Sequence, residues 1–170
     1  MSIPNPYYAE ILRANASGLP IASQQAQSGE TQMLPGRAHH LLVADDDPGL
    51  LAAYVDYFEI HGYEVRAAQD GVDALAEYCR WFPALVILDI QMPRLDGREV
   101  AREIRRRKRG PSPLLVAVSG LSSQAERALC LQSGFDHHVA KPAQMPVILA
   151  MVASHSRISD PDIAQVHSRC

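Results

Sequence analysis

Five short apolar runs alternate with stretches of helical spacing along most of this 170-residue chain. The runs are residues 41–44, 63–68, 84–88, 114–118 and 137–140. Brief apolar runs bounded by polar or turn residues are typical of strands buried on both faces of a parallel sheet. Because parallel strands are joined by right-handed crossovers, the helices between them cover both faces. The sequence therefore predicts an α/β fold, a doubly wound five-stranded parallel sheet in (βα)₅ order.

The stretches between the runs carry apolar residues three or four positions apart, which is the spacing of a helix face packed on a core. The predicted stripes are Leu50, Tyr54 and Phe58; Val72, Leu75, Ala76 and Cys79; Val100 and Ile104; Ala125 and Leu129; and Val147, Ile148, Met151 and Val152. Helix starts are expected at Asp47 and Ser122. Helix ends are expected at Gly62, Gly110 and Gly134.

The alternating pattern is confined to residues 39–155, which we predict to be one domain. Residues 1–38 and 156–170 are irregular, so both are expected to be flexible tails. Neither is long enough for a second domain, so a stand-alone domain without an effector domain is expected. No apolar run approaches the ~18 residues of a spanning helix, and no secretory signal is present. We therefore expect a cytoplasmic protein that does not insert into membranes.

Charge and cysteine content narrow the classes of partner. The chain has 16 Lys and Arg against 19 Asp and Glu, and its net charge of −3 argues against binding to nucleic acid. The basic run Arg105–Arg109 closes a predicted helix, where cations meet the carbonyl end of the helix dipole favourably. Contact of this run with DNA or RNA is the less favoured interpretation. Three cysteines at unrelated spacings indicate a reducing compartment, with neither a disulfide framework nor a zinc site.

Polar residues follow four of the five predicted strands. They are Asp45 and Asp46 after the first, Asp89 after the third, Ser119 after the fourth and Lys141 after the fifth. Because ligands gather at the carboxyl ends of such strands, these side chains are expected to converge. Crowded carboxylates need a cation, and oxygen ligands with open positions favour Mg²⁺. A lysine and a hydroxyl at the same point suit a phosphoryl group, which makes Asp89 a candidate nucleophile.

Four segments resemble, in order and spacing, the signature segments of response-regulator receiver domains. They are LLVADDD (41–47), LVILDIQMPRLDG (85–97), VAVSG (116–120) and HHVAKP (137–142). The resemblance covers residues 39–155. It implies a flavodoxin-like sheet and a phosphorylatable switch of a two-component system. Such a switch is not an enzyme beyond its own phosphoryl transfer and autodephosphorylation.

The resemblance also implies roles for the acidic residues. Asp89 matches the phosphoacceptor of the family. Asp45 and Asp46 match the acidic pair that holds Mg²⁺ together with the phosphoacceptor. Gln91 matches the position that usually gives the metal a backbone carbonyl.

Two further positions are implied to act on the phosphoryl group and to pass on the signal. Ser119 matches the switch hydroxyl, and Lys141 matches the phosphate-binding lysine before its characteristic proline. His138 is a departure, because the family usually has Tyr or Phe there as a rotameric switch. Imidazole is smaller and can ionise near neutral pH, so weaker burial of this side chain is expected. The alternative is that His138 stays on the surface in both states.

A histidine kinase or a histidine phosphotransfer protein is the implied donor of the phosphoryl group. Output is expected through a protein partner. That partner is expected to meet the face formed by the helix near 125–129, the strand 137–140 and the helix near 147–152.

Two other classes of function stay open at this point. In a haloacid-dehalogenase-type phosphatase, Asp45 would be the nucleophile, and Ser119 and Lys141 would bind phosphate. However, no acidic motif follows Lys141 in a further strand. A pseudo-receiver that acts without phosphorylation typically lacks one of the acids or the lysine, and this sequence has them all.

Overall fold

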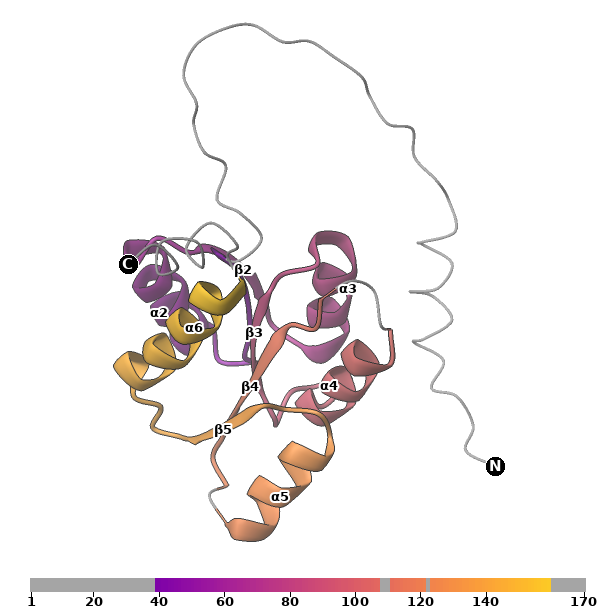
Figure 1. Cartoon of the computed structure of the whole chain (residues 1–170). Helices are drawn as coiled ribbons and strands as arrows, with labels where there is room; N and C mark the ends of the chain where they lie inside the picture. The colour runs from indigo at the N-terminus through magenta and orange to yellow at the C-terminus, as the bar shows by residue number, and fades with distance from the viewer. Residues whose placement is uncertain (1–38, 108–110, 122, 160–170) are drawn as a thin grey trace, which may run out of the picture. The chain divides into compact units, whose positions relative to one another are not determined.

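The computed structural model of the chain describes residues 39–107, 111–121 and 123–159. The predictions for residues 1–38, 108–110, 122 and 160–170 lie outside this described part. Within it, five strands alternate with five helices along the chain. Figure 1 shows how these elements are arranged in space. The predicted α/β fold class is therefore confirmed.

The strands form one sheet in which all neighbouring strands are parallel. They are β1 (His40–Ala44), β2 (Glu64–Ala68), β3 (Leu85–Asp89), β4 (Leu114–Ser119) and β5 (His137–Ala140). Their order across the sheet is β2-β1-β3-β4-β5, so the direction of winding reverses between β1 and β3. In sheets of this kind, ligands bind beyond the carboxyl ends of the strands at such a switch point.

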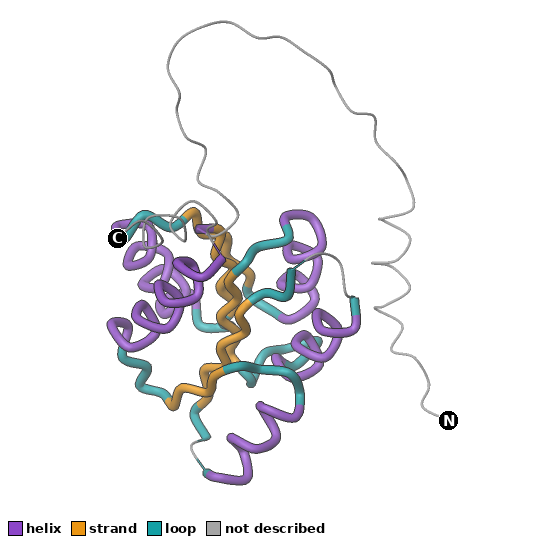
Figure 2. The backbone as a smooth tube through the Cα atoms, in the orientation of Figure 1, coloured by secondary structure: helices purple, strands orange, loops and turns teal. Residues whose placement is uncertain are grey.

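The helices are α2 (Pro48–Ile60), α3 (Gly71–Trp81), α4 (Gly97–Arg106), α5 (Gln124–Gln132) and α6 (Met145–Ser159). Figure 1 and Figure 2 show α2 and α6 on one face of the sheet and α3 and α4 on the other. Side-chain caps begin four of them, at Asp47, Asp70, Asp96 and Ser123. Helix α6 continues to Ser159, so the domain boundary predicted after residue 155 falls inside a helix. None of the helices in the described ranges is long and apolar enough to cross a membrane.

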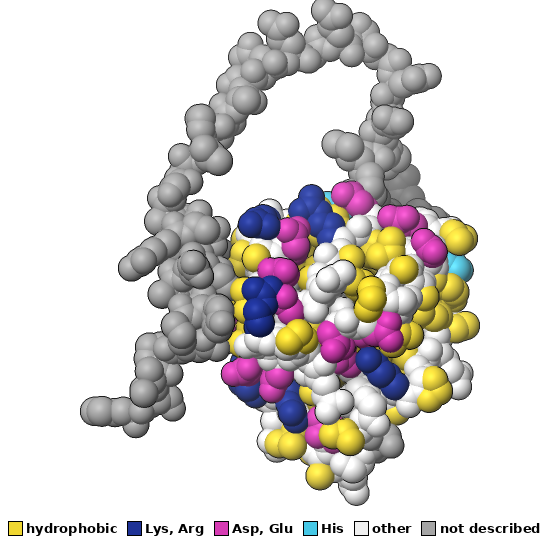
Figure 3. Space-filling model, turned by 180° about the vertical axis from the view of Figure 1, so that it is seen from behind, with side chains coloured by type: hydrophobic (Ala, Val, Ile, Leu, Met, Phe, Trp, Pro, Cys, Tyr) yellow, Lys and Arg dark blue, Asp and Glu magenta, His cyan; other side chains and the backbone are white. Residues whose placement is uncertain are grey.

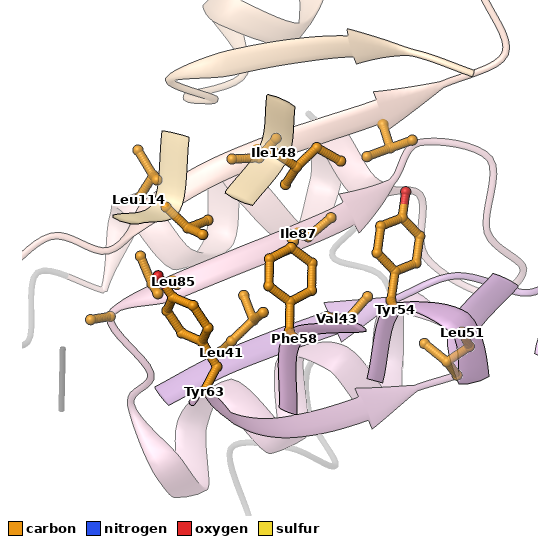
Figure 4. Close-up of a cluster of buried hydrophobic side chains, with 14 residues drawn as sticks. Leu41, Val43, Leu51, Tyr54, Phe58, Tyr63, Leu85, Ile87, Leu114 and Ile148 are labelled. Carbon is orange, nitrogen blue, oxygen red and sulfur yellow. The ribbon is translucent and has the colours of Figure 1, made fainter. Parts of the chain in front are cut away.

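A hydrophobic layer fills the space between the sheet and the pair α2 and α6, as Figure 4 shows. Phe58 of α2 and Ile148 of α6 are fully buried there, together with Val43 and Ile87 of the two central strands. Burying a side chain of this size stabilises the fold by roughly 1.5–3 kcal/mol. Because β3 is buried along its whole length, its carboxyl end is held firmly within the sheet.

Two glycines let the β3–α4 loop, residues 90–96, pass close to neighbouring backbone. A Cβ at Gly97 would lie 2.2 Å from the carbonyl oxygen of Asp89, and a Cβ at Gly71 would lie 2.0 Å from that of Leu95. No other residue fits at either position without a shift of the backbone. The Gly97 N–H also donates to the carbonyl of Ile90 at 3.1 Å. The loop is thereby packed against both the end of β3 and the start of α3.

The predicted apolar stripe of α5 is wrong. Leu129 and Ala125 are exposed, whereas Glu126 and Cys130 are buried. The physical reason is that α5 docks on α4 through polar groups, with Arg98 paired to Glu126 at 3.0 Å. A carboxylate can be buried when it is paired in this way. Apolar periodicity does not detect a helix face of this kind.

The remaining stripes are confirmed in part. Buried residues of these stripes are Tyr54, Phe58, Leu75, Val100, Ile104, Ile148 and Val152. On α3 the buried face also contains Ala74 and Tyr78, so the predicted Val72, Ala76 and Cys79 lie at its half-buried edge. Leu50 and Val147 are exposed at the borders of their stripes.

The described arginines of the basic run are engaged within the domain. Arg105 donates to the carbonyl oxygen of Gly134 at 2.8 Å, which ties α4 to the loop before β5. Arg106 and Arg107 pair with Glu103, at 2.9 and 3.0 Å. On the face displayed in Figure 3, basic side chains are interspersed with acidic ones. These three arginines therefore serve helix packing and neutralise acids of the domain.

Gly97→Ala is expected to destabilise the domain by roughly 1–3 kcal/mol, because the added Cβ would press on backbone atoms of β3. Urea denaturation measures this change. The matched control is Gly120→Ala after β4, where the nearest atom to an added Cβ is Gln91 Oε1 at 4.0 Å. This control has room for the methyl group, so it should change stability by no more than roughly 0.5 kcal/mol. Equal stability of Gly97→Ala and wild type would contradict the close contact.

Candidate functional site

Three charged side chains from three strand ends meet at the carboxyl edge of the sheet. Lys141, directly after β5, places its Nζ atom 2.9 Å from Asp45 Oδ2 and 2.9 Å from Asp89 Oδ1. Asp45 directly follows β1, and Asp89 is the last residue of the adjacent strand β3. The structure thus brings together three of the residues that the strand ends were expected to deliver. We call Asp45, Asp89 and Lys141 the acid–lysine cluster.

Burial controls the electrostatics of this cluster. The side chains of Asp45 and Asp89 are only 2% and 3% exposed. Burial raises the pKa of Asp89, and the Asp45 charge adds to this, while the Lys141 ammonium and the Gln91 backbone N–H act in the opposite direction. Burial alone would lower the pKa of Lys141, but hydrogen bonds to Asp89 and Asp45 leave it above its ordinary value. When both acids are ionised, the cluster has one negative charge in excess.

Ser119 ends β4 and is fully buried. Its carbonyl oxygen accepts a hydrogen bond from the Lys141 backbone N–H at 2.8 Å, which ties the ends of β4 and β5 together. Its Oγ atom accepts from the Leu121 N–H at 3.0 Å. Because the hydroxyl accepts in this arrangement, its own proton remains a donor for a group beyond the strand ends.

Asp46 and Gln91 adjoin the cluster along the chain. Asp46 is exposed at the start of the loop to α2. The Gln91 side chain is exposed, while its backbone N–H lowers the pKa of the Asp89 carboxyl. Asp47 has a different task, because its Oδ1 accepts from the Gly49 N–H at 2.8 Å and caps α2.

His138 lies on β5 opposite Ala117 of β4. Its side chain is half-buried, which is neither the surface position nor the full burial of a core residue. Its Nε2 atom is buried and has no hydrogen-bond partner among the described residues. A buried polar atom without a partner costs free energy, so this side chain would gain from movement or from a new partner.

Tyr54 lies near the site, and the sequence alone did not predict this position. Its spacing from Leu50 and Phe58 predicts only that it belongs to the apolar stripe of α2. The ring is 2% exposed and lies at the end of the core layer nearest the strand arrowheads in Figure 4. Burial, together with the charge of Asp45, raises the pKa of Tyr54 to about 12, so the phenol stays protonated. The available signal was a tyrosine in an apolar stripe about two helical turns after Asp47.

The donor chemistry of this edge fits Mg²⁺. In the part of the chain that the structure describes, no three His, Cys, Asp or Glu side chains are grouped to hold a metal ion. Asp45, Asp46 and Asp89 therefore do not form such a group. Mg²⁺ does not require one, because it usually keeps several waters and takes one or two carboxylates plus phosphate oxygens. The excess negative charge beside Lys141 and the oxygen donors around it suit such an ion.

Residues 41–153 match the family model of the response regulator receiver domain. The match covers more than half of the chain, so the chain belongs to this family of two-component signalling domains. The fold agrees with this assignment, and the phosphatase alternative is set aside.

Individual relatives are response regulators. The chain is 35% identical over 122 residues to response regulator MprA of Mycobacterium sp. (strain KMS), covering 72% of this chain and 52% of that protein. It is 34% identical over 124 residues to MprA of Mycobacterium leprae (strain TN), covering 73% of this chain and 54% of that protein. The chain thus spans about half the length of the curated relatives it matches.

Solved structures of receiver domains are similar to this one. The receiver domain of Francisella response regulator 1452 has a TM-score of 0.67 and 26% identity, covering 71% of this chain and 98% of that chain. The BeF₃-activated N-terminal receiver domain of Klebsiella pneumoniae RstA has a TM-score of 0.63 and 29% identity, covering 69% of this chain and 98% of that chain. The similarity thus extends over nearly the whole of each solved receiver domain.

Asp89→Asn is expected to raise the free energy of unfolding at pH 7.5 by roughly 1 kcal/mol. The raised pKa means that folded Asp89 binds a proton more readily than unfolded Asp89. The stability of the fold therefore falls as the pH rises from the ordinary pKa of Asp89 to its raised pKa. At neutral pH the ionised Asp89 carboxylate thus lowers the free energy of unfolding. The substitution removes this cost, and Lys141 keeps Asp45 as a partner. Urea denaturation without divalent cations measures the gain.

The gain should shrink at lower pH, where wild-type Asp89 becomes protonated. Asp47→Asn is the matched control, because Asn caps a helix as well as Asp does, and its effect should stay within roughly 0.5 kcal/mol. A loss of stability in Asp89→Asn at pH 7.5 would contradict the electrostatic account.

Proposed function

We propose that this chain is a phosphorylation-dependent signalling switch. In this proposal Asp89 accepts a phosphoryl group from a histidine kinase or a histidine phosphotransfer protein. The observation that carries the proposal is the Lys141 ammonium, which lies 2.9 Å from each of the carboxylates of Asp89 and Asp45. Membership of the receiver family supports it.

The residues of the cluster suit this transfer. A carboxylate oxygen of Asp89 attacks the phosphorus of phosphohistidine, so that a P–O bond forms as the P–N bond breaks and the imidazole nitrogen takes up a proton. Lys141, already beside Asp89, pairs with a phosphoryl oxygen. Water later hydrolyses the acyl phosphate and returns the carboxylate of Asp89. This autodephosphorylation is the only turnover that we propose.

Mg²⁺ belongs beside the cluster in this proposal. The residues that would hold it are Asp45, Asp46, Asp89 and the backbone carbonyl of Gln91. When bound, the ion offsets the negative charge of the phosphoryl oxygens. The excess negative charge left by Asp45 and Asp89 beside Lys141 supports this assignment.

The signal is proposed to leave through the face formed by α5, β5 and α6, to a downstream protein. Phosphorylated Asp89 presents new acceptor oxygens, toward which the Ser119 hydroxyl turns as a donor. His138, whose Nε2 atom is buried and unpaired, then turns into the space that Ser119 vacates. Exposed apolar side chains suited to a protein partner on or beside these elements are Leu121, Leu129, Leu131 and Val147.

One broader assignment, the cytoplasmic location, stays a prediction within this proposal. The buried thiol of Cys130, which is not in a disulfide, favours a reducing compartment. Nucleic acid is not the proposed partner, since Arg105 and Arg107 are paired within the domain.

Incubation with acetyl phosphate and Mg²⁺ is expected to add one phosphoryl group to the protein, and to add far less without a divalent cation. Asp89→Asn should add none, because the acceptor carboxylate is gone. Asp46→Ala should label poorly, because it removes an anchor of the metal. Intact mass measures all three. The matched control is Asp47→Asn, an exposed carboxylate of the same edge, which should label like wild type. Unchanged labelling of Asp89→Asn would falsify the proposal.

The complex with beryllofluoride and Mg²⁺ tests the route of the signal. We expect the backbone resonances of Ser119, Val139 and α5 to shift when it forms. His138→Ala should reduce the shifts in α5 while those next to Asp89 persist. His137→Ala, at the neighbouring exposed position, is the control and should behave like wild type. If resonances next to Asp89 respond but those of Ser119, Val139 and α5 do not, the route through β5 is wrong.

A further inference from the structure

We propose that Arg94 is a positioning residue for phosphoryl transfer at Asp89. Its ion pairs with Asp70 and Asp73 hold the β3–α4 loop, and with it the backbone of Gln91, in place beside the phosphoacceptor. The inference rests on the proposed function of Asp89, but it concerns a loop contact that can be measured without any phosphoryl donor.

The backbone of Arg94 has an unusual conformation. Its φ angle is 66°, in the left-handed region that residues with a Cβ rarely adopt. A residue keeps such a conformation when its surroundings fix it. Here the side chain supplies the fixing contact, because the guanidinium reaches the N-terminal turn of α3.

Asp70 is well placed to hold this guanidinium. Its Oδ1 atom accepts hydrogen bonds from the N–H groups of Val72 and Asp73, both at 2.9 Å, as the cap of α3. Its Oδ2 atom pairs with Arg94 Nη2, which also lies 3.0 Å from Asp73 Oδ1. The Asp70 side chain is only 12% exposed, so the pair is partly shielded from water. Because the helix already fixes this carboxylate, pairing costs it little conformational entropy.

Arg94 lies in a short exposed stretch between the buried side chains of Met92 and Leu95. After it, Leu95 is buried with its carbonyl oxygen against Gly71, and the Gly97 N–H bonds to Ile90. Before it, Gln91 is exposed between the buried side chains of Ile90 and Met92. The backbone of Gln91 adjoins the site, because Gln91 follows Asp89 by two positions and its N–H lowers the pKa of the Asp89 carboxyl.

Loss of the Arg94 contacts should therefore loosen the loop backbone around Gln91, although the buried side chains of Ile90 and Met92 keep the loop on the domain. An ion pair of which one partner is 40% exposed contributes little to overall stability. A small displacement of a group that orients the reacting atoms can nevertheless slow a reaction greatly. The expected signature is a change in metal affinity and loop mobility with little change in melting temperature.

The test compares Arg94→Ala, Arg94→Lys and Asp70→Asn in the full chain. Asp70→Asn keeps a capping oxygen for α3 but removes the charge that faces Arg94. The first readout is amide hydrogen exchange of residues 90–93 in the unphosphorylated protein. The second is Mg²⁺ affinity by calorimetry, and the third is the rate of labelling by acetyl phosphate.

We expect Arg94→Ala to weaken Mg²⁺ binding by about tenfold and to speed amide exchange at Gln91. Asp70→Asn should show both effects in smaller measure, because the Arg94–Asp73 pair remains. The double variant, which combines Arg94→Ala with Asp70→Asn, should be no worse than Arg94→Ala alone, because Arg94→Ala already removes the pair with Asp70. Arg94→Lys should recover most of the affinity.

Arg80→Ala is the matched control, since Arg80 is an arginine of α3 that pairs with Glu77 at 2.7 Å and not with Asp70. It should match wild type in every readout. Exchange and Mg²⁺ affinity within about twofold of wild type in both Arg94→Ala and Asp70→Asn would overturn the positioning role alone. A wild type that takes up no phosphoryl group would instead overturn the proposed function.

Discussion

Two buried carboxylates, Asp45 and Asp89, share the single ammonium group of Lys141, which lies 2.9 Å from each. The proposed chemistry depends on this arrangement. Burial makes an ionised Asp89 costly, as its raised pKa shows, and one lysine cannot neutralise two acids. In our account, the negative charge that Lys141 leaves unneutralised attracts Mg²⁺. The carboxylate of Asp89 then accepts the phosphoryl group, and Lys141 together with the metal offsets the charge of the phosphoryl oxygens.

Two kinds of packing surround this cluster. Strand β3 and the start of α4 are tightly packed, whereas helix α5 is held on α4 by polar contacts. Strand β3 is buried along its length, and Gly97 lets α4 start in contact with the backbone of Asp89. Helix α5 is different, because its buried residues are Glu126 and Cys130. Its links to α4 are polar, namely the Arg98–Glu126 pair and the hydrogen bond from Arg102 to the Ser133 hydroxyl at its C-terminal end. A helix held in this way can shift without opening a large apolar core. That property suits the output role proposed for the face formed by α5, β5 and α6.

Much of the fold and of the cluster could be predicted from sequence, for a clear physical reason. Buried parallel strands are short apolar runs, and the residue after each run must lie at one edge of the sheet. This reasoning places Asp45, Asp89 and Lys141 together without any knowledge of the loops. The cap at Asp47 is equally local, since Pro48 follows it.

Contacts that join distant segments through side chains could not be predicted in the same way. The Glu126 face of α5 depends on an arginine 28 positions earlier in the chain. The Arg94–Asp70 pair depends on a left-handed backbone angle at Arg94 that local sequence does not specify. Tyr54 fits a core stripe so well that its place near the acids becomes visible only once α2 is packed on the sheet.

Reductive trapping of the phosphorylated protein tests the central claim most directly. Borohydride converts an acyl phosphate of aspartate to homoserine, and peptide mass mapping then locates the converted residue. The account predicts homoserine at position 89 and at no other aspartate, Asp45 and Asp46 included. Conversion at another position, or phosphorylated protein that yields no homoserine, would contradict it.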